Sequence, residues 1–353
     1  IWTDVDGFMT ADPKVISRAY CIDHLSYSEA MELSHFGAKV IYPPTILPAY
    51  QKKIAIKIKN TFNPMAAGTL ISDRVERDVA RQIKGISSIK NVSLVTVQGI
   101  GMVGVPGISM RLFTCLASEE VNVILISQAS SENSISIVVD SSLALVAYKA
   151  IAKKQISRII VDEEMAVVAI VGEKMKQTTG IAGQLFNSVG KNGVNVYAIA
   201  QGGSEINISF VIKEKNIRKA LNVIHEAFFL SDYSRLNLFL AGKGTVGSKL
   251  LSKISAQAKK LQSENRLRIR LVGLAGSKSM IMDREGLDPE KVIEQLEREG
   301  EAGNINDFKE KIIAMNVANS VFVDCTASEE VAAVYLPLLE SNVSVVTANK
   351  IAS

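Results

Sequence analysis

Apolar residues in the first part of this chain follow two patterns, one typical of a helix and one of a strand. In SYSEAMELSHFGAKVI, residues 26–41, apolar residues recur every three or four positions, and Ser28 with Glu29 provides a start signal, so a helix is predicted. Apolar and basic residues alternate from Ile54 to Lys59, which predicts a strand with one buried face. The charged stretch SDRVERDVARQIKG is then predicted to be a connector.

The middle of the chain contains one pattern twice, 73 residues apart. The segment LISQASSENSIS at 125–136 matches AIAQGGSEINIS at 198–209, so Gln128 corresponds to Gln201. The match begins earlier and needs no gap. Its equivalent pairs include Gly99 and Gly172, Met102 and Met175, Gly107 and Gly180, Ile108 and Ile181, and Leu112 and Leu185. Such a run indicates a duplicated module.

Each copy shows the same order of predicted elements. An apolar strand leads through a glycine-containing loop to a helix, and two strands and a second helix follow. The predicted elements are 92–97, 108–116, 121–126, 134–139 and 144–151 in the first copy, and 166–171, 181–189, 194–199, 207–212 and 217–229 in the second. This β-α-β-β-α order predicts a ferredoxin-like sandwich, usually closed by a fourth strand. Two copies are too few for a solenoid, so a side-by-side pair is expected.

The last part of the chain alternates short apolar strands with helical stretches. LNLFLAGKGTVGSKLLSKI reads as a strand, a tight glycine turn and a helix. LRIRLVGLAG, SVFVDCT and VSVVTANK are further predicted strands. Alternating strands and helices predict a parallel, doubly wound α/β sheet. The chain is therefore divided into four parts: 1–72, 85–160, 161–232 and 236–353.

Composition limits the classes of function. The chain has 353 residues, of which 47% are hydrophobic and 22% charged, as in a folded multidomain protein. Its formal net charge is +4 and its basic residues are dispersed, which weakly favours anionic ligands and predicts no nucleic-acid partner. No apolar stretch is long enough for a membrane span. Three cysteines, Cys21, Cys115 and Cys325, match no metal or redox spacing, so we expect buried, reduced thiols, no metal site and a cytoplasmic location.

The strongest local signal is a glycine motif that follows a predicted strand and opens a predicted helix. Its six residues are Gly242, Lys243, Gly244, Thr245, Val246 and Gly247. The first glycine permits a tight turn, the second lets backbone amides approach a pyrophosphate, and the third permits close packing of helix and strand. This context predicts a dinucleotide site of the Rossmann type. The alternative is a glycine turn without a ligand.

The end of the next strand bears on which nicotinamide cofactor is bound. NAD sites usually have an acidic residue there, but this strand ends with Ser277 and Lys278. A lysine would attract the 2′-phosphate of NADP, so NADP or mixed use is favoured, and Lys243 can add positive charge. The alternative, that both lysines are solvated surface residues, stays open.

Three sets of motifs resemble those of one enzyme family. GKGTVG, VFVDCTASEEVA and VVTANK are similar to the nucleotide-binding half of homoserine dehydrogenase. IWTDVDGFMTADPK, SYSEAMELSHFGAKVIYPPTILP and NTFNPMAAGTLIS resemble the end of an aspartate kinase domain and its exit into the regulatory region. The repeat resembles the paired ACT domains of that kinase. All three sets, in this order, resemble bifunctional aspartokinase/homoserine dehydrogenases over essentially the whole chain.

The resemblance implies a fold for each part. Residues 1–72 are expected to be the C-terminal part of an amino-acid-kinase α/β fold. The repeat, at 85–160 and 161–232, is expected to form two ferredoxin-like ACT domains. Residues 236–353 are expected to form a truncated Rossmann-type NAD(P)-binding domain.

The resemblance also implies site residues for a kinase that uses ATP with Mg. Thr3 and Asp4 of WTDVDG match the nucleotide contact, and Lys39 of FGAKV matches the lysine near the phosphates. Two ATP-binding positions depart from the family, because Met9 stands for its usual tyrosine and Lys14 for its arginine. Met9 lacks ring stacking, and Lys14 keeps the charge without the bidentate fork.

In the dehydrogenase half, the resemblance places Thr326 beside the nicotinamide and Lys350 near both nicotinamide and substrate carbonyl. A lysine there polarises the carbonyl or takes part in proton transfer, so Lys350 is the predicted catalytic residue. The family's adenosine-side asparagine is replaced by Gly276. The implied reactions are phosphorylation of aspartate and reduction of aspartate semialdehyde to homoserine.

The repeat is expected to supply feedback control. A glutamine amide offers both a donor and an acceptor to a bound amino acid, and Gln128 and Gln201 follow equivalent strands. They are the predicted effector-binding residues, with threonine as the expected effector. Ser130 is replaced by Gly203 and Asn133 by Ile206, so unequal sites are expected. Paired ACT domains also imply a homo-oligomer.

Both ends of the chain look cut, and the resemblance implies that parts of both active sites lie outside it. We therefore expect these 353 residues alone to catalyse neither reaction. One alternative is a non-catalytic amino-acid sensor with vestigial flanking domains. Another, an NADP-binding oxidoreductase of different specificity, is disfavoured by the kinase motifs.

Overall fold

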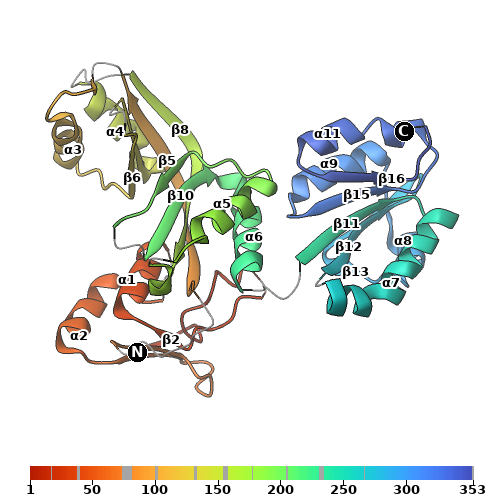
Figure 1. The fold of residues 1–353 in the computed structure, drawn as a ribbon, viewed down its shortest axis with the longest axis horizontal. Helices are drawn as coiled ribbons and strands as arrows, with labels where there is room; N and C mark the ends of the chain where they lie inside the picture. The colour runs from red at the N-terminus through yellow and green to blue at the C-terminus, as the bar shows by residue number, and fades with distance from the viewer. Residues whose placement is uncertain are drawn as a thin grey trace. The chain divides into compact units, whose positions relative to one another are not determined.

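A computed structural model describes most of the chain (Figure 1). The described ranges are 1–16, 18–37, 40–73, 82–99, 102–130, 133–153, 158–176, 178–203, 206–229, 234–265 and 267–351. They form two compact units, one of residues 1–187 with 194–228 and the other of residues 188–193 with 229–353.

The N-terminal part of the first unit is a small four-stranded sheet with two helices. Its elements are β1 (Trp2–Thr3), β2 (His24–Leu25), α1 (Tyr27–His35), η1 (Pro43–Thr45), α2 (Ile46–Lys52), β3 (Ile56–Asn60) and β4 (Thr69–Ile71). The strand order is β1-β3-β4-β2. Buried Ile56 and Ile58 of β3 pack with Leu33 of α1, because alternate strand residues point to the helix-covered face. The predicted strand at 54–59 is thus largely confirmed.

Helix α1 begins earlier than predicted. Its N-cap is Ser26, whose hydroxyl accepts from the Glu29 amide at 3.1 Å, while the Ser26 amide donates to Glu29 Oε2 at 3.0 Å. This capping box starts the helix at Tyr27, so Glu29 is part of the start signal as predicted, but its partner is Ser26 and not Ser28. The helix ends at His35, before the predicted apolar position Val40, and Gly37 follows with φ +107°.

The repeat forms one six-stranded sheet with helices on its outer faces. Its elements are β5 (Gly85–Gln98), α3 (Ile108–Ser118), β6 (Leu125–Gln128), β7 (Ser134–Asp140), η3 (Ser141–Leu143), α4 (Ala144–Ala152), β8 (Arg158–Val171), η4 (Glu173–Met175), α5 (Ile181–Lys191), β9 (Ala198–Ala200), β10 (Asn207–Lys213), η5 (Glu214–Asn216) and α6 (Ile217–Phe229). The strand order is β6-β7-β5-β8-β10-β9. Both copies have the predicted β-α-β-β-α order.

The fourth strand of each sandwich comes from an exchange between two long strands. Residues 92–98 of β5 pair with 158–165 of β8, and this pairing closes the first copy. Residues 85–89 of β5 pair with 167–171 of β8, and this pairing closes the second copy. The second copy is therefore completed by residues that precede the first copy, and β8 runs continuously from one copy into the other.

The sheet faces that bear no helices share one core. Buried Leu94 and Val138 from the first copy cluster with Val167 and Val211 from the second. The outer strands β6 and β9 lie side by side, and Ser127 Oγ donates to the Ile199 carbonyl oxygen at 2.8 Å. The two copies therefore share one apolar interior.

The second strand of each copy is shorter than predicted. β6 and β9 begin at Leu125 and Ala198, whereas the patterns predicted strands from 121 and 194. Val121 is a buried core residue outside any strand. Its backbone amide donates to the Leu116 carbonyl oxygen of the preceding helix at 3.0 Å. Buried apolar residues in a loop resemble a strand in sequence.

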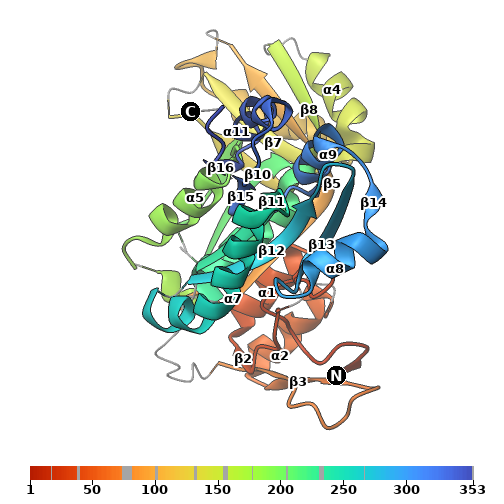
Figure 2. The same ribbon diagram turned by 90° about the vertical axis from the view of Figure 1, so that its right-hand side faces the viewer.

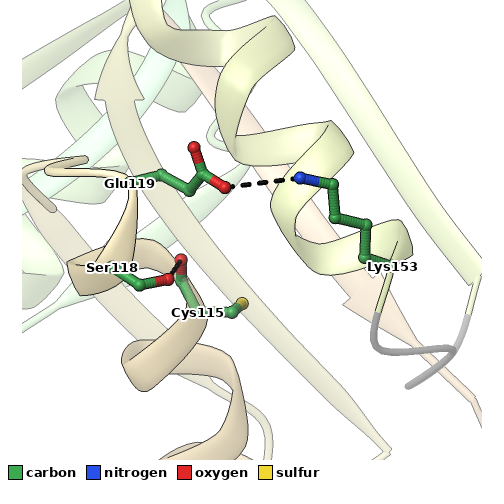
Figure 3. Close-up of polar contacts among 4 residues, drawn as sticks. All are labelled: Cys115, Ser118, Glu119 and Lys153. Atoms are coloured by element: carbon green, nitrogen blue, oxygen red, sulfur yellow. Dashed lines mark hydrogen bonds and ion pairs between the residues drawn. The ribbon is translucent and has the colours of Figure 1, made fainter.

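In the first copy, helices α3 and α4 are also joined at their C-terminal ends. Figure 3 shows Lys153, which follows α4, reaching Glu119, which follows α3, with 3.4 Å between Nζ and Oε1. In the same view Ser118 Oγ donates to the Cys115 carbonyl oxygen at 2.9 Å. This ion pair adds a polar link at the rim of the apolar helix contact.

The second unit contains a six-stranded sheet with helices on both faces (Figure 2). Its elements are β11 (Ser234–Ala241), α7 (Thr245–Asn265), β12 (Leu267–Ala275), β13 (Ser279–Leu287), α8 (Val292–Glu299), β14 (Glu301–Ala302), α9 (Ile305–Met315), β15 (Ser320–Asp324), α10 (Glu329–Ala332), α11 (Tyr335–Glu340) and β16 (Ser344–Thr347). Leu251 of α7 and Leu296 of α8 pack on one face, and Phe308 of α9 and Leu338 of α11 pack on the other.

The four strands predicted in this part are parallel, as expected, whereas two further strands that were not predicted, β13 and β14, are antiparallel. The strand order is β14-β13-β12-β11-β15-β16, and the four neighbouring strands β12, β11, β15 and β16 are parallel. β13 and β14 are antiparallel to their neighbours. The turn from Gly276 to Ser279, closed by an amide-to-carbonyl bond of 2.8 Å, is too short for the crossover that a parallel pair needs.

Two further expectations concern burial and membranes. Cys115 is buried, but Cys21 and Cys325 are partly exposed, so the expectation of three buried thiols is wrong. Cys325 follows the last residue of β15, where the strand leaves the core. No helix among the described residues is long and apolar enough to cross a membrane. The cytoplasmic location stays a prediction.

Candidate functional site

The glycine turn between β11 and α7 has the geometry that a dinucleotide needs. Gly242 has φ +102°, and its amide donates to the Ala275 carbonyl oxygen at 2.8 Å. A Cβ on Gly247 would lie 2.0 Å from the Gly242 carbonyl oxygen, so the helix packs closely only without a side chain there. A Cβ on Gly244 would meet no heavy atom within 4 Å. The approach to the helix N-terminus is therefore open, as a pyrophosphate requires.

The other predicted cofactor residues lie around the same sheet edge. Thr245 and Val246 form the exposed first turn of α7. Thr326 lies just beyond β15, and a Cβ on Gly242 would come 3.0 Å from its Cγ2 atom, so the structure brings the turn and this threonine together. Lys350 is exposed and follows β16, the parallel neighbour of β15.

The two lysines predicted to attract a 2′-phosphate, Lys243 and Lys278, have different surroundings. Lys243 Nζ lies 2.7 Å from Glu297 Oε1 of α8, so this carboxylate offsets its charge. Ser277 and Lys278 are exposed in the hairpin between β12 and β13. That hairpin contains no acidic side chain, because its residues are Gly276, Ser277 and Lys278. The site therefore offers a 2′-phosphate one exposed lysine and no opposing carboxylate in this turn.

In the kinase part, the structure describes four of the five predicted ATP-binding residues. Thr3 Oγ1 donates to Asp4 Oδ1 at 3.1 Å at the end of β1. Met9 forms an antiparallel bridge with Cys21, and the Lys14 side chain is exposed. Lys39 lies outside the described residues.

Polar residues that were not predicted from the sequence hold this loop in place. Asp6 Oδ1 accepts from Asn60 Nδ2 at 2.7 Å and from Asn63 Nδ2 at 3.2 Å. These bonds tie the segment that bears Thr3 and Asp4 to the end of β3. The sequence offered no local signal for them, since the partners are more than 50 residues apart.

The two predicted effector glutamines line equivalent pockets. Gln128 lines a pocket of about 330 Å³ and Gln201 one of about 300 Å³. Each pocket contains the glycine that precedes the helix, and Gly107 and Gly180 have nearly the same φ, +87° and +89°. Gly107 makes no side-chain cap, so amides in the first turn of α3 remain available for an anion such as a carboxylate.

The walls of the two pockets differ at two adjacent positions and at a third, where the first pocket has Ser109 and the second Ala182. The first pocket has Val105 and Pro106 where the second has Thr178 and Thr179. Thr178 Oγ1 donates to the Lys174 carbonyl oxygen at 2.6 Å. The second pocket is therefore lined by hydroxyl groups at a place where the first is apolar. This difference adds to those predicted after the glutamines.

A buried polar cluster joins the second copy to the kinase part. Glu29 Oε1 accepts from the Glu173 amide at 2.9 Å, and Ser26 Oγ donates to Glu173 Oε1 at 2.7 Å. Asn207 Nδ2 donates to Glu32 Oε2 at 2.6 Å. The capping signal Ser-x-x-Glu at 26–29 was visible in the sequence, but its partners in the repeat were not.

A buried histidine makes a second connection. His225 of α6 is 1% exposed, and its Nε2 lies 3.1 Å from Thr10 Oγ1, close to the predicted ATP-binding residues. Burial and, to a smaller extent, the positive charge of Arg18 lower the pKa of His225 to about 4. The ring is therefore neutral at pH 7 and serves as a hydrogen-bonding contact.

A metal site was not predicted, and the part of the chain that the structure describes contains no group of three or more His, Cys, Asp or Glu side chains able to hold an ion.

Family models match all three parts of the chain. The amino acid kinase family matches residues 1–60, the ACT domain matches 95–155 and 168–228, and the NAD-binding domain of homoserine dehydrogenase matches 242–353. The two ACT matches are offset by the same 73 residues as the repeat.

Relatives have the same arrangement. The chain is 38% identical over 363 residues to bifunctional aspartokinase/homoserine dehydrogenase 1, chloroplastic, of Arabidopsis thaliana, which covers 99% of this chain and 40% of the relative. It is 38% identical over 358 residues to the bifunctional enzyme of Haemophilus influenzae, covering 99% of this chain and 44% of that protein. The chain thus spans about two fifths of the length of these curated relatives.

Solved aspartate kinases match about two thirds of the chain. The Clostridium acetobutylicum enzyme aligns with a TM-score of 0.60 at 34% identity, over 64% of this chain and 53% of that one. Aspartokinase III of E. coli, in complex with aspartate and ADP, aligns with a TM-score of 0.58 at 28% identity, over 65% of this chain and 52% of that one. With its kinase, ACT and NAD-binding parts in the order of these relatives, the chain belongs to the bifunctional aspartokinase/homoserine dehydrogenase family.

Proposed function

We propose that the protein is a bifunctional enzyme of the aspartate pathway. One reaction is the ATP-dependent phosphorylation of L-aspartate to 4-phospho-L-aspartate, and the other is the NAD(P)H-dependent reduction of aspartate semialdehyde to L-homoserine. The observation that supports this most strongly is 38% identity to bifunctional relatives across 99% of the chain, through all three parts in one order.

In the kinase half, we propose that Thr3, Asp4, Met9, Lys14 and Lys39 contact ATP. Asp4 is oriented by Thr3, and the loop is anchored through Asp6. ATP with Mg supplies the phosphoryl group when bound. Because phosphoryl transfer depends on positioning and neutralisation of charge, the task of these residues is to hold the nucleotide and, for the lysines, to offset phosphate charge.

In the dehydrogenase half, the open glycine turn from Gly242 to Gly247 holds the pyrophosphate, and Thr326 contacts the nicotinamide side. The bound cofactor supplies the hydride. Lys350 lies near the substrate carbonyl, where its ammonium group stabilises the developing negative charge on oxygen. Lys278, exposed in a hairpin without an acid, favours NADP over NAD.

The ACT pair binds an amino-acid effector, and we propose threonine. The glutamine amide, the open helix N-terminus and a volume of about 300 Å³ suit a small molecule that has both a carboxylate and an ammonium group. Control then works as feedback if threonine binding shifts a conformational equilibrium felt at the catalytic halves. Association of ACT pairs into a homo-oligomer belongs to the same proposal.

A chimera tests the two activities. Residues 1–353 replace the matching stretch of the Haemophilus influenzae enzyme, and both activities are measured beside the unaltered enzyme. We expect aspartate-dependent ATP turnover and semialdehyde-dependent NADPH oxidation. A folded chimera, verified by circular dichroism and gel filtration, that has neither activity would refute the bifunctional proposal.

A non-catalytic amino-acid sensor is the competing function. It predicts threonine binding by the chain without nucleotide binding. Titration of the 353-residue chain with NADPH, followed by nicotinamide fluorescence, separates the two proposals. Saturable binding supports the enzyme, and threonine binding without any NADPH or NADH binding supports the sensor.

A further inference from the structure

A buried carboxylate lies beneath the predicted cofactor loops. Asp324, the last residue of β15, is 0% exposed. Its Oδ1 accepts from the Thr326 amide at 2.7 Å, and its Oδ2 accepts from Asn349 Nδ2 at 3.0 Å and from the Tyr335 hydroxyl at 2.6 Å. A buried carboxyl group needs such partners, because burial removes it from water and leaves any unpaired oxygen without a hydrogen bond.

The three donors come from three different segments. Thr326 lies in the loop after β15, Tyr335 begins α11, and Asn349 lies in the loop after β16. Burial, and next the hydrogen bond to Asp324, raise the pKa of Tyr335 to about 12. The phenol therefore stays protonated and continues to donate to Asp324 throughout the physiological range.

Asn349 extends the cluster to both sides of Lys350. Its Nδ2 also donates to the Ser328 carbonyl oxygen at 2.8 Å, and its Oδ1 accepts from the Ile351 amide at 3.0 Å. The backbone amide of Asn349 donates to Thr347 Oγ1 at 2.9 Å. The residue before Lys350 and the residue after it are thus both hydrogen-bonded, although the Lys350 side chain is exposed.

The position of this cluster argues for a role beyond stability. In open α/β sheets, ligands bind outside the carboxyl ends of the strands, and Asp324 lies at that end of β15. Phe322, two residues earlier on β15, is fully buried among apolar side chains, so a buried position on this strand can be filled by an apolar residue. The carboxylate instead bonds the two loops that bear Thr326 and Lys350.

We propose that Asp324 is a positioning residue for the dehydrogenase half. It holds the Thr326 loop and the Lys350 loop in one fixed relation, and thereby sets the place where the nicotinamide end of the cofactor is held. This inference rests on the proposed cofactor function. It assigns Asp324 no contact with cofactor or substrate, and it assigns Tyr335 and Asn349 the part of fixing the carboxylate.

Asp324→Asn is the sharpest change, because it keeps the size of the side chain. Both carboxylate oxygens face N–H donors, one from Thr326 and one from Asn349. Either orientation of the new amide therefore places its NH₂ group against a donor. In Asp324→Asn with Asn349→Asp, the new amide can donate to residue 349 and still accept from the Thr326 amide, so partial recovery is expected.

The experiment measures binding of NADPH and of 2′,5′-ADP, which has only the adenosine end, to the 353-residue chain. For Asp324→Asn we expect NADPH affinity to fall about tenfold or more, with 2′,5′-ADP affinity within about twofold of wild type. The double variant should regain part of the NADPH affinity. All titrations are made below the unfolding transition of each variant, which is followed by circular dichroism.

Asn237→Ala is the matched control. Asn237 is also buried and polar, with bonds to the Ala318 carbonyl oxygen and to Arg270, but it lies near the opposite end of the same sheet. It should lower thermal stability while leaving NADPH affinity within about twofold. Tyr335→Phe removes one of three donors and should have a smaller effect on NADPH than Asp324→Asn.

The outcomes separate the inference from the proposed function. Unchanged NADPH affinity in folded Asp324→Asn, or equal weakening of NADPH and 2′,5′-ADP, would overturn the positioning role alone. A wild-type chain that binds neither NADPH nor NADH would overturn the cofactor function, and the inference with it.

Discussion

The two ACT copies share a fold and differ most at the surface that meets the kinase part. Their glycine loops share an equivalent hydrogen bond: the amides of Gly99 and Gly172 donate to the carbonyl oxygens of Asn133 and Ile206, each at 2.9 Å. The second copy, however, contacts the kinase part through Glu173, Asn207 and His225. The equivalent residues of the first copy are Ile100, Ser134 and Ala152.

This difference assigns separate tasks to two similar modules. Both copies keep the glycine conformation and the glutamine of the proposed effector pocket, whereas Glu173, Asn207 and His225 form polar contacts with the kinase part in the second copy. Glu173 lies two residues before Met175, the first residue that lines the second pocket, in the same short helical turn. We therefore expect threonine binding at the second pocket, rather than at the first, to affect the contacts of α1 directly.

The largest effect is expected from protonation of His225. Because its pKa falls from 6.5 to about 4 on folding, the unfolded chain binds the proton more readily, so the stabilisation present above pH 6.5 is lost as the pH falls towards 4. The shift corresponds to about 3 kcal/mol. Urea unfolding of wild type and His225→Gln, from pH 7.5 to 4, measures it.

Only the difference between the two proteins reports on His225, since carboxylates also titrate in this range. Glutamine can still bond Thr10 but does not titrate, so the variant should lose less stability on acidification. Parallel curves for the two proteins would contradict a buried neutral histidine at this contact.

Loss of the shared carboxylate at Glu29 should have the next largest effect. Glu29→Ala removes the acceptor of the Ser26 and Glu173 amides, which should cost about 2 kcal/mol in urea unfolding of the chain. The control is Asp140→Ala in the first copy, where an exposed carboxylate caps a turn through the Ser142 amide at 2.9 Å. Asp140→Ala should cost about 0.5 to 1 kcal/mol, and an equal or larger loss there would contradict the distinct role of the second copy.

Effector binding should distinguish the copies by about 1 kcal/mol per site. Gln128→Ala and Gln201→Ala should each weaken threonine binding about fivefold or more in calorimetry. Thr178→Val should weaken only the second site, because its pocket loses a hydroxyl group that the first pocket lacks. Unchanged threonine affinity in both glutamine variants would refute the proposed effector site.

What could be predicted from the sequence depends on how far apart the partners are. The order of elements, the glycine turn and the equivalence of Gln128 and Gln201 are local or periodic patterns, and the structure has them. The exchange between β5 and β8 and the contact between Glu29 and Glu173 join residues 60 or more positions apart. The periodicity of a sequence reports on local structure and does not predict such long-range pairing. The antiparallel β13 was missed because its short turn resembles the end of a parallel strand.

The cluster around Asp324 shows the same limit. Asp324, Tyr335 and Asn349 were each visible in the sequence, but only the parallel pairing of β15 with β16 places their loops together. The resemblance indicated Thr326 and Lys350 through their motifs. Asp324, which bonds the loops that bear them, was not indicated by any motif.

The smallest effect is expected at the exposed ion pair that only the first copy has. Lys153 and Glu119 lie 3.4 Å apart with side-chain exposures of 71% and 42% (Figure 3), and the second copy has Glu226 and Asn192 at these positions. Exposed pairs contribute about 0 to 1 kcal/mol, so Lys153→Ala should lower the free energy of unfolding by less than about 1 kcal/mol. The loss should shrink further in 1 M salt, where charges are screened within about 3 Å. A loss above about 2 kcal/mol, or one insensitive to salt, would mean that the joint between α3 and α4 is stabilised by packing of the lysine stem and not by charge.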